Sequence, residues 1–394
     1  MSETKDTNVA IYSDNRLRFL GGGEITLIDM ANYFSSLGIN TFLYDDSQSS
    51  DMSRISEYSL IQLIKASYRS VPYTRAGFPT LYHPMPQKNT LSMHMVNFVS
   101  IHRLPSKKYL EDISKLTSKV VLSCHGIGVQ RRYPYNFLVF FYQLYMRYQI
   151  RRISRTVNAS KNVSFQVLTL SVASIFSRYG INFSKIAVIP NGLDTIEYKI
   201  GKNDSVFTVI FMGRVNNLQK GIRRLISVVR ILNKLKPVIR VIAVGSGPDH
   251  TLLEGLHCEN FHYFGYVDSK KKMELLANAN LLLITSNMEP FSLVCIEGLF
   301  SGLPVVSTPV PGPEEIFSMI PDSGMIAGFS PRKLAKYVVS YYDQWLGDKE
   351  DYYRRKMERS TASKGKYNLD AMNSNYLKLA ISLSGAEQSN HSIM

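Results

Sequence analysis

Two cations and two glutamates in the C-terminal half are the residues whose types and spacing best suit chemistry. Arg214 and Lys220 follow an apolar run that ends at Met212, with a glycine beside each cation. Glycines let the backbone approach a ligand closely, while a guanidinium and an ammonium bind phosphate oxygens ahead of a helix N-terminus. Cations at this spacing also occur on solvated surfaces, but the predicted strand, glycine turn and following helix together favour a diphosphate.

Glu289 and Glu297 stand eight positions apart and follow another apolar run, Leu281–Thr285. The run predicts a strand, so Glu289 falls in the loop at its carboxyl end and Glu297 falls inside the next helix. The loop carboxylate can accept hydrogen bonds from sugar hydroxyls, and the helix carboxylate can accept both hydroxyls of a ribose. A solvated loop glutamate and an exposed helix glutamate remain the alternative interpretation.

The N-terminal half offers glycines and a histidine. Gly22 and Gly23 lie between the first predicted strand and helix, where the backbone could approach a phosphate or simply turn. Their spacing does not form a Gly-x-Gly-x-x-Gly fingerprint, so it gives little support to dinucleotide binding. His125 follows the predicted strand Val120–Cys124 and should emerge at a sheet edge, although a lone histidine is more often structural. His102 is a weaker candidate of the same kind.

Strands alternating with amphipathic helices must position these residues. The alternation predicts parallel sheets covered on both faces, hence an α/β protein with two Rossmann-like domains. The predicted strands are 9–13, 41–44, 96–101, 120–124, 207–212, 241–244, 281–285 and 305–307, and the helices are 24–37, 222–235, 269–277, 293–301, 331–345 and 375–383. A turn-forming cluster at Pro190–Gly192 separates the two series. We therefore predict domains at 1–194 and 195–365, a helix within 366–383 and a disordered tail at 384–394.

Composition narrows the class of protein. With 394 residues, 45% hydrophobic and 20% charged, the chain is long enough for two globular domains. Its three cysteines are far apart and show no metal-ligand spacing, which favours a reduced compartment without a zinc site. No apolar signal segment stands at the N-terminus, and no run reaches the roughly 18 to 20 apolar residues that span a bilayer. We expect a cytoplasmic protein that can lie peripherally on the inner face of a membrane.

The net charge of +15 is concentrated in one tract. Residues 113–193 contain no acid and eleven Lys or Arg, and within them 135–148 is dense in Phe and Tyr. Arginines beside aromatic residues suit the surface of an anionic membrane. A buried helix that covers the sheet explains the same tract equally well. The arginines predicted to contact a membrane or acceptor are Arg131, Arg132, Arg147, Arg151 and Arg152.

In order and spacing, these motifs resemble glycosyltransferase family 4, the retaining enzymes of GT-B architecture, whose two Rossmann-like domains face each other across a cleft. The resemblance runs from about Gly21 to Phe317 and is strongest from Ile189 onward. The matching motifs are Ile189–Asp194, Gly213-Arg214, Lys220-Gly221, the pair Glu289 and Glu297, and Gly302–Val305. The chain departs from the family at Pro290 and Ser292, where glycines are usual, and this departure leaves the donor sugar open.

The resemblance implies a retaining, metal-independent glycosyltransferase with no cofactor and a UDP- or GDP-sugar as donor. It implies that Arg214 and Lys220 bind the diphosphate, Glu289 and His125 contact the transferred sugar, and Glu297 binds the ribose. The other implied donor contacts are Gly22, Gly23, Tyr266, Val267, Phe291, Ser292 and Leu293. Domain 1–194 would receive a glycan or lipid-linked acceptor, domain 195–365 would hold the donor, and the helix in 366–383 would return to the first domain.

Other functions stay open at this point. An epimerase of the same fold would consume a nucleotide sugar without an acceptor, and a phosphorylase would need a lysine-bound pyridoxal phosphate and a longer chain. A nucleotide-sugar binder without activity is a further possibility, which the four charged site residues argue against. The basic charge alone would suit a nucleic-acid-binding protein, but no helix-turn-helix or RNA-recognition signature accompanies it, so we expect no specific nucleic-acid partner.

Overall fold

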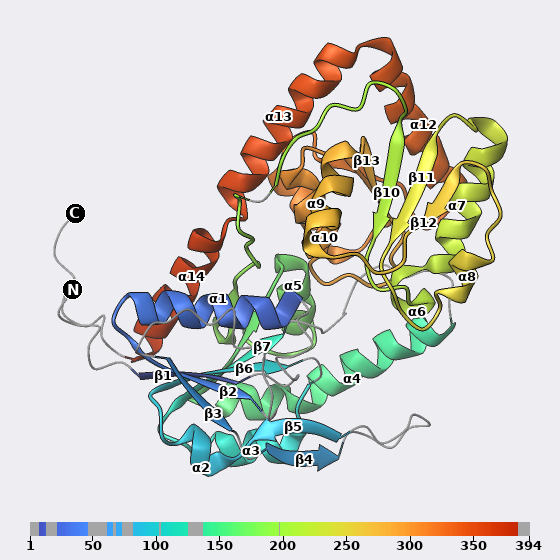
Figure 1. Ribbon diagram of the computed structural model, residues 1–394. Coiled ribbons are helices and arrows are strands. Elements are labelled where there is room, and N and C mark those ends of the chain that lie inside the picture. The colour runs from blue at the N-terminus through green and yellow to red at the C-terminus, as the bar shows by residue number, and fades with distance from the viewer. Residues whose placement is uncertain are drawn as a thin grey trace. The chain divides into compact units, whose positions relative to one another are not determined.

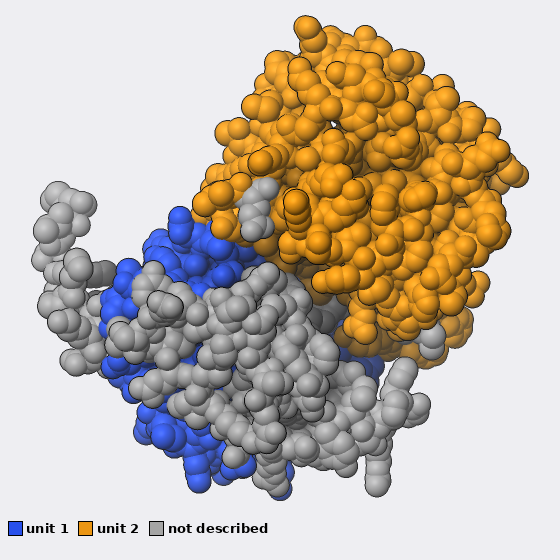
Figure 2. All heavy atoms as spheres, viewed as in Figure 1, with its two compact units in different colours: residues 1–129, 144–192, 369–394 blue, residues 130–143, 193–368 orange. Residues whose placement is uncertain are grey.

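The computed structural model describes residues 8–12, 22–45, 61–65, 68–72, 82–101, 104–124, 137–196 and 198–384. Its contacts divide the chain into two units, coloured separately in Figure 2. Unit 1 comprises residues 1–129, 144–192 and 369–394, and unit 2 comprises 130–143 and 193–368. Each unit has its own parallel sheet, and Figure 1 labels most of the strands and helices.

The described part of unit 1 contains a seven-stranded sheet in the order β3-β2-β1-β6-β7-β8-β9, with every pair parallel. Its strands are β1 Asn8–Tyr12, β2 Asn40–Asp45, β3 Ile61–Lys65, β6 Val96–Ile101, β7 Lys119–Cys124, β8 Val163–Val167 and β9 Ile186–Val188. A separate antiparallel pair consists of β4 Tyr68–Pro72 and β5 Tyr82–Pro86. Strand β6 is buried along its length, including its polar residues Asn97 and Ser100, as expected for a sheet covered on both faces.

The helices of unit 1 include one from each end of the chain. They are α1 Gly22–Ser36, α2 Lys88–Leu91, α3 Lys107–Ile113, α5 Leu170–Arg178, a 3-10 turn at Phe183–Lys185 and α14 Leu369–Ser384; α4, Phe137–Ala159, begins in the segment 130–143. Phe34 of α1 and Tyr376 of α14 are buried in one hydrophobic cluster with Phe98 of the sheet. The rings of Tyr376 and Phe98 lie edge to face, with centroids 5.6 Å apart.

Unit 2 contains a six-stranded parallel sheet in the order β12-β11-β10-β13-β14-β15. The strands are β10 Thr208–Met212, β11 Arg240–Val244, β12 Phe261–Tyr263, β13 Leu281–Ile284, β14 Val305–Ser307 and β15 Gly324–Ile326. The strand order reverses between β10 and β13. In open parallel sheets a ligand binds outside the carboxyl ends of the strands at such a reversal, so the loops after β10 and β13 are the first place to look for a site.

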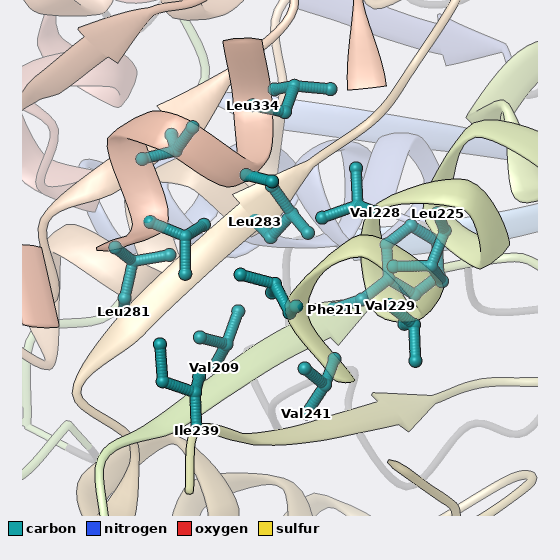
Figure 3. Packing of buried hydrophobic residues seen from close by; sticks show 14 of the residues in the cluster. Val209, Phe211, Leu225, Val228, Val229, Ile239, Val241, Leu281, Leu283 and Leu334 are labelled. Atoms are coloured by element: carbon teal, nitrogen blue, oxygen red, sulfur yellow. The ribbon is translucent and has the colours of Figure 1, made fainter. Parts of the chain in front are cut away.

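Helices on both faces of this sheet complete its core. They are α6 Asn217–Lys220, α7 Ile222–Leu235, α8 Thr251–Glu254, α9 Ser269–Asn278, α10 Leu293–Phe300, α11 Pro311–Met319, α12 Pro331–Gly347 and α13 Lys349–Lys366. Leu225 and Val229, one helical turn apart on α7, are fully buried against the sheet. Figure 3 shows them beside Phe211 of β10, with Leu334 of α12 in the same cluster. Each fully buried aliphatic side chain contributes about 1.5–3 kcal/mol to folding.

The structure confirms the predicted α/β class with two parallel sheets. The limits of β6, β14 and α7 are those predicted, and most other predicted elements differ by one or two residues at an end. One assignment was wrong: α1 begins at Gly22, so Gly22 and Gly23 are its first two residues and not a loop. The first residues of a helix need no intrahelical partner for their amides, so the helix can begin on glycines.

The chain passes between the units at four places, and two of these places have neighbouring residues within unit 2. These two divisions fall after Gly192 and after Asn368. The amide of Leu193 donates to the carbonyl of Tyr367 at 2.9 Å, and Leu193 and Asn368 form an isolated parallel bridge. Residues 369–384, as helix α14, then belong to unit 1.

Candidate functional site

After β10, the side chain of Lys220 lies close to Gly213. Gly213 has a φ of +142°, and a Cβ there would lie 3.4 Å from Cε of Lys220. Lys220 ends the short helix α6, which is capped by the side chain of Asn216 and terminated by Gly221 in the left-handed conformation. Arg214, next to Gly213, is exposed. The loop therefore brings an ammonium and bare backbone together at the carboxyl end of β10.

Gly221 fastens this loop to the end of β13. A Cβ at Gly221 would lie 2.2 Å from the carbonyl oxygen of Thr285, so only glycine fits. The hydroxyl of Thr285 donates to the carbonyl of Lys220 at 2.8 Å. The two loops on either side of the strand-order reversal are thus joined through their backbones.

Lys220 and Glu289 form an ion pair at this reversal. Nζ of Lys220 lies 2.5 Å from Oε2 of Glu289, and the side chains are only 12% and 10% exposed. The hydroxyl of Ser286 donates to the same oxygen at 3.1 Å. Two residues assigned different parts of a donor therefore neutralise each other in a largely water-excluded position, where charges interact more strongly than on the surface.

A second cation, Arg224, supports the loop after β13 through hydrogen bonds. Arg224 of α7 donates through Nη1 to the carbonyl of Thr285 at 2.6 Å and to Oδ1 of Asn287 at 2.8 Å. Burial lowers the pKa of Arg224 to about 10. The Nδ2 of Asn287 donates to the carbonyls of Asn217 and Leu218. These contacts make Arg224 and Asn287 supports for the loop that carries Glu289.

The start of α10 presents backbone amides beside Glu289. Ser292, the N-cap, is buried and has a φ of +92°, and its hydroxyl accepts from the amide of Cys295 at 3.3 Å. Gly312 at the start of α11 donates its amide to the carbonyl of Glu289 at 3.0 Å, and a Cβ there would lie 1.4 Å from the carbonyl oxygen of Phe291. Since a helix N-terminus carries a partial positive charge, this packed loop suits an anion. Ser292 therefore occupies a backbone conformation that glycine adopts far more readily, at a position where the family usually has glycine.

Glu297 lies in the second turn of α10 and is held from two sides. Nζ of Lys272 in α9 lies 2.7 Å from Oε1, and the hydroxyl of Tyr198 donates to the same oxygen at 3.2 Å. Neither Lys272 nor Tyr198 was singled out from the sequence. Lys272 is the third of three consecutive lysines, a pattern typical of a solvated surface, so the sequence carried no signal for this pairing.

The loops after β11 and β12 meet the loop after β10. A Cβ at Gly245 would lie 2.0 Å from the carbonyl oxygen of Gly213, and the amide of Gly245 donates to the carbonyl of Gly265 at 2.7 Å. Tyr266 follows and is 80% exposed, while Val267 is half-buried. The described donor candidates of unit 2 therefore follow the carboxyl ends of β10, β12 and β13, in loops or, for Lys220, Leu293 and Glu297, in the next helix.

The candidates of the N-terminal half are less fully described. His125, Arg131 and Arg132 lie outside the described residues. Arg151 and Arg152 are exposed on α4. Arg147 is half-buried on the same helix, with its guanidinium 5.9 Å from the ring centroid of Tyr179. Among the described residues, no group of three or more His, Cys, Asp or Glu is arranged to hold a metal ion, and no helix is long and apolar enough to cross a membrane.

The part of the chain that carries this site is similar to a known family. Residues 194–359 match the family described as Glycosyl transferases group 1. An uncharacterised 41.2 kDa protein in the cps region of Klebsiella pneumoniae is 27% identical over 188 residues, which are 44% of this chain and 51% of that protein. The A subunit of phosphatidylinositol N-acetylglucosaminyltransferase from Arabidopsis thaliana is 27% identical over 157 residues, 38% of this chain and 34% of the relative. The chain thus matches about half or less of the length of these relatives.

The fold of the whole chain has counterparts among solved structures. The Anabaena protein HepE in complex with UDP and glucose superposes with a TM-score of 0.68, covering 95% of this chain and 100% of HepE at 16% identity. This identity shows a shared fold and no more. The family match covers the segment that carries Arg214, Lys220, Glu289 and Glu297, with their loops on the reversal of a Rossmann-type sheet. Residues 194–359 of the chain are therefore similar to the group 1 glycosyltransferases.

Proposed function

We propose that the chain is a retaining glycosyltransferase that moves a sugar from a nucleotide-sugar donor, bound by unit 2, to a glycan or lipid-linked acceptor. The Lys220–Glu289 pair at the reversal of the sheet carries this proposal. The ammonium and the carboxylate are in contact beside the start of a helix, so each can bind a different half of a sugar diphosphate. Lys220 would turn to the diphosphate, and Glu289 would accept from the sugar hydroxyls.

The chemistry rests on stabilising the leaving group. As the bond between sugar and diphosphate breaks, negative charge grows on the departing phosphate oxygens. Arg214, Lys220 and the amides at the start of α10 stand at one sheet edge, where preorganised positive charge lowers the barrier. Attack of the acceptor on the same face of the sugar would retain its configuration without an enzymic nucleophile, as the resemblance to glycosyltransferase family 4 implies. His125 is proposed to contact the transferred sugar.

The relatives support a nucleotide sugar and a membrane-borne acceptor. HepE has been solved with UDP and glucose and with UDP-glucose. The Arabidopsis relative is named for transfer of N-acetylglucosamine to phosphatidylinositol, a lipid. By analogy, we propose a UDP-sugar or GDP-sugar donor for this chain and an acceptor of the glycan or lipid-linked class.

Donor binding and slow donor hydrolysis test the proposal. Calorimetry and product detection would be run with UDP-, GDP- and ADP-sugars on the full chain, on Lys220→Ala and on Lys236→Ala. Lys236 is a matched control because it is a lysine of unit 2 whose side chain is 42% exposed and whose partner, Asp343, lies 3.9 Å away. We expect one donor to bind, with affinity lost in Lys220→Ala and kept in Lys236→Ala. Binding of no nucleotide or nucleotide sugar by the unchanged chain would overturn the proposal.

Metal independence is part of the proposal. If Arg214 and Lys220 neutralise the diphosphate, a divalent ion has no charge left to balance. Turnover of the donor should then survive exhaustive treatment with EDTA, and added Mg²⁺ or Mn²⁺ should change it by less than about twofold. Loss of turnover in EDTA, restored by a divalent ion, would show that the cations do not suffice.

Helix α4 is proposed to dock the chain on an anionic membrane that carries the acceptor. The helix is not apolar all round: Met146, Ile150, Ile153 and Val157 are buried, spaced as one helical face. Its exposed large apolar side chains are Phe137, Phe140, Phe141, Leu144 and Tyr148, and its exposed cations are Arg151, Arg152 and Arg155. An exposed apolar stripe followed by arginines suits the interface of an anionic bilayer.

Co-sedimentation with vesicles tests this docking. The chain should sediment with vesicles that contain phosphatidylserine and much less with phosphatidylcholine alone. Phe141→Ser and Arg151→Gln should each weaken sedimentation, because both side chains are exposed and their loss leaves the buried face of α4 intact. Arg223→Gln, an exposed arginine of α7, is the control for a general loss of charge. Equal sedimentation with neutral and anionic vesicles would contradict the docking.

A further inference from the structure

The carboxylate of Glu297 receives two protein donors on the same oxygen. Nζ of Lys272 and the hydroxyl of Tyr198 both approach Oε1, at 2.7 Å and 3.2 Å. Lys272 belongs to α9 and Tyr198 to the segment before β10, so the donors come from two places in the chain other than α10. The side chain of Glu297 is 11% exposed, which makes a compensating cation important for a charged group there.

Both donors are held by contacts of their own. The ring of Tyr198 is buried edge to face against Phe300 of α10, with centroids 5.4 Å apart, and its carbonyl accepts from Nζ of Lys364 at 2.9 Å. The start of α9 is capped by Asp268, whose side chain accepts from the amide of Lys271 at 2.7 Å. Lys272 is one residue further along and only 28% exposed. The hydroxyl and the ammonium therefore converge on Oε1 from a framework of packed elements.

We infer that Lys272 and Tyr198 are positioning residues that give the proposed donor site its selectivity for a ribose over a deoxyribose. This inference rests on the proposed function, in which Glu297 receives the ribose. With Oε1 occupied by a charge-assisted bond and a hydroxyl, the plane of the carboxylate is fixed, and the second oxygen, Oε2, is presented to the 2′- and 3′-hydroxyls. A carboxylate without these donors would rotate and lose the geometry that distinguishes the sugars.

Lys271, the neighbouring residue of α9, provides a matched control. It is 41% exposed, and its ammonium lies 2.9 Å from Oε1 of Glu274 in the same helix. Lys271→Met removes the same charge from the same helix as Lys272→Met and leaves the contacts of Glu297 unchanged. A general effect of the basic run 270–272 on an anionic ligand would therefore act on both variants, whereas positioning of Glu297 would act on one.

The experiment measures selectivity and not only affinity. Calorimetry with UDP, GDP and ADP identifies the nucleotide that the unchanged chain binds, and its 2′-deoxy counterpart gives the ratio of dissociation constants. We expect the ratio to fall by about tenfold in Lys272→Met, the factor supplied by one hydrogen bond to a charged group. Lys271→Met should keep the original ratio, and Lys272→Arg, which keeps a cation, should retain most of it.

The outcomes separate this inference from the proposed function. If the unchanged chain binds none of the nucleotides, the proposed function fails and the inference falls with it. If nucleotides bind and Lys272→Met keeps the full selectivity, the inference alone is overturned. Should Lys272→Met fail to fold, Tyr198→Phe removes one donor to Oε1 while keeping the buried ring, and an unchanged ratio in that variant overturns the inference equally.

Discussion

Removing the cation of the Lys220–Glu289 pair should destabilise unit 2 as well as abolish donor binding. In Lys220→Met the carboxylate of Glu289 keeps the hydroxyl of Ser286 as a donor but loses its cation, in a position only 10% exposed. Adding Glu289→Gln to Lys220→Met removes that unpaired charge. The double variant should therefore be more stable than Lys220→Met alone, although it still lacks both groups proposed to bind the donor.

The distance and burial of the pair set the size of the effect. At 2.5 Å and an effective dielectric constant of about 20, the attraction is about 7 kcal/mol before desolvation is subtracted. Removing one partner of a buried ion pair typically lowers the free energy of unfolding by about 3–5 kcal/mol. Because the two side chains keep some exposure, we expect a value at the lower end of this range. We expect Lys220→Met to lose about 3 kcal/mol and the double variant to lose about 1 kcal/mol, so that adding Glu289→Gln to Lys220→Met recovers about 2 kcal/mol.

The chain offers a specific probe for the measurement. Its one tryptophan, Trp345, is buried in the core cluster of unit 2, so its fluorescence reports the unfolding of that unit in urea. The unchanged chain, Lys220→Met, Glu289→Gln and the double variant complete a cycle that isolates the pair. A coupling below about 0.5 kcal/mol, the limit within which independent sites add, would refute the reasoning. A double variant that recovers donor binding together with stability would refute the assigned roles.

Three further predictions use the same tryptophan signal. Burial lowers the pKa of Lys356 to about 7, whereas the same amine in the unfolded chain stays protonated to about pH 10. Between pH 7 and 9 the unfolded state therefore binds more protons than the folded state. The free energy of unfolding should rise over this range by up to about 1.4 kcal/mol per pH unit more than in Lys356→Met. Ser292→Gly should raise stability by about 0.5–1 kcal/mol, because glycine accepts the φ of +92° without strain and is nearly as good an N-cap. Gly312→Ala should lose several kcal/mol and donor binding, because its Cβ would overlap the carbonyl of Phe291, whereas Gly365→Ala, with open space around it, should not destabilise.

Each of these three has a result that contradicts it. A pH dependence identical in the unchanged chain and in Lys356→Met would show that the buried amine does not change charge in this range. Destabilisation by Ser292→Gly would mean that the hydroxyl contributes more than the backbone conformation costs. Equal stability of Gly312→Ala and Gly365→Ala would mean that the loop before α10 can move away from α11 without loss.

Periodic elements were predictable from the sequence, and polar elements with buried faces were not. The limits of β6 and β14 follow from short, mainly apolar runs, and the limits of α7 follow from the spacing of buried residues on one helical face. Helix α13 was missed because its sequence is strongly polar, yet Lys356 and Arg359 are fully or almost fully buried in it. Arg359 donates to the carbonyls of Asp322 and Gly302, contacts that depend on residues far away in the chain. No local pattern distinguishes such cations from solvated ones.

In the candidate site, too, the residues of local motifs were predictable and the contacts between distant residues were not. The motif residues Lys220 and Glu289 were singled out, and the structure adds that they contact each other. Lys272 was overlooked, since its partner is 25 residues away and its neighbours in the sequence are also lysines. The departure at Ser292 was visible in the sequence, but its meaning came from the backbone, which keeps a left-handed conformation although the residue is not glycine.

The return of α14 to unit 1 separates the order of synthesis from the order of folding. A ribosome releases residues 193–368, almost all of unit 2, before the helix that packs on α1 and Phe98 has been made. Until residues 369–384 emerge, the buried faces of Phe34 and Phe98 lack the cover of Tyr376. The first sheet to be synthesised is therefore the last to be completed. Truncation at residue 368 should expose apolar surface in unit 1, giving a chain that aggregates while unit 2 folds.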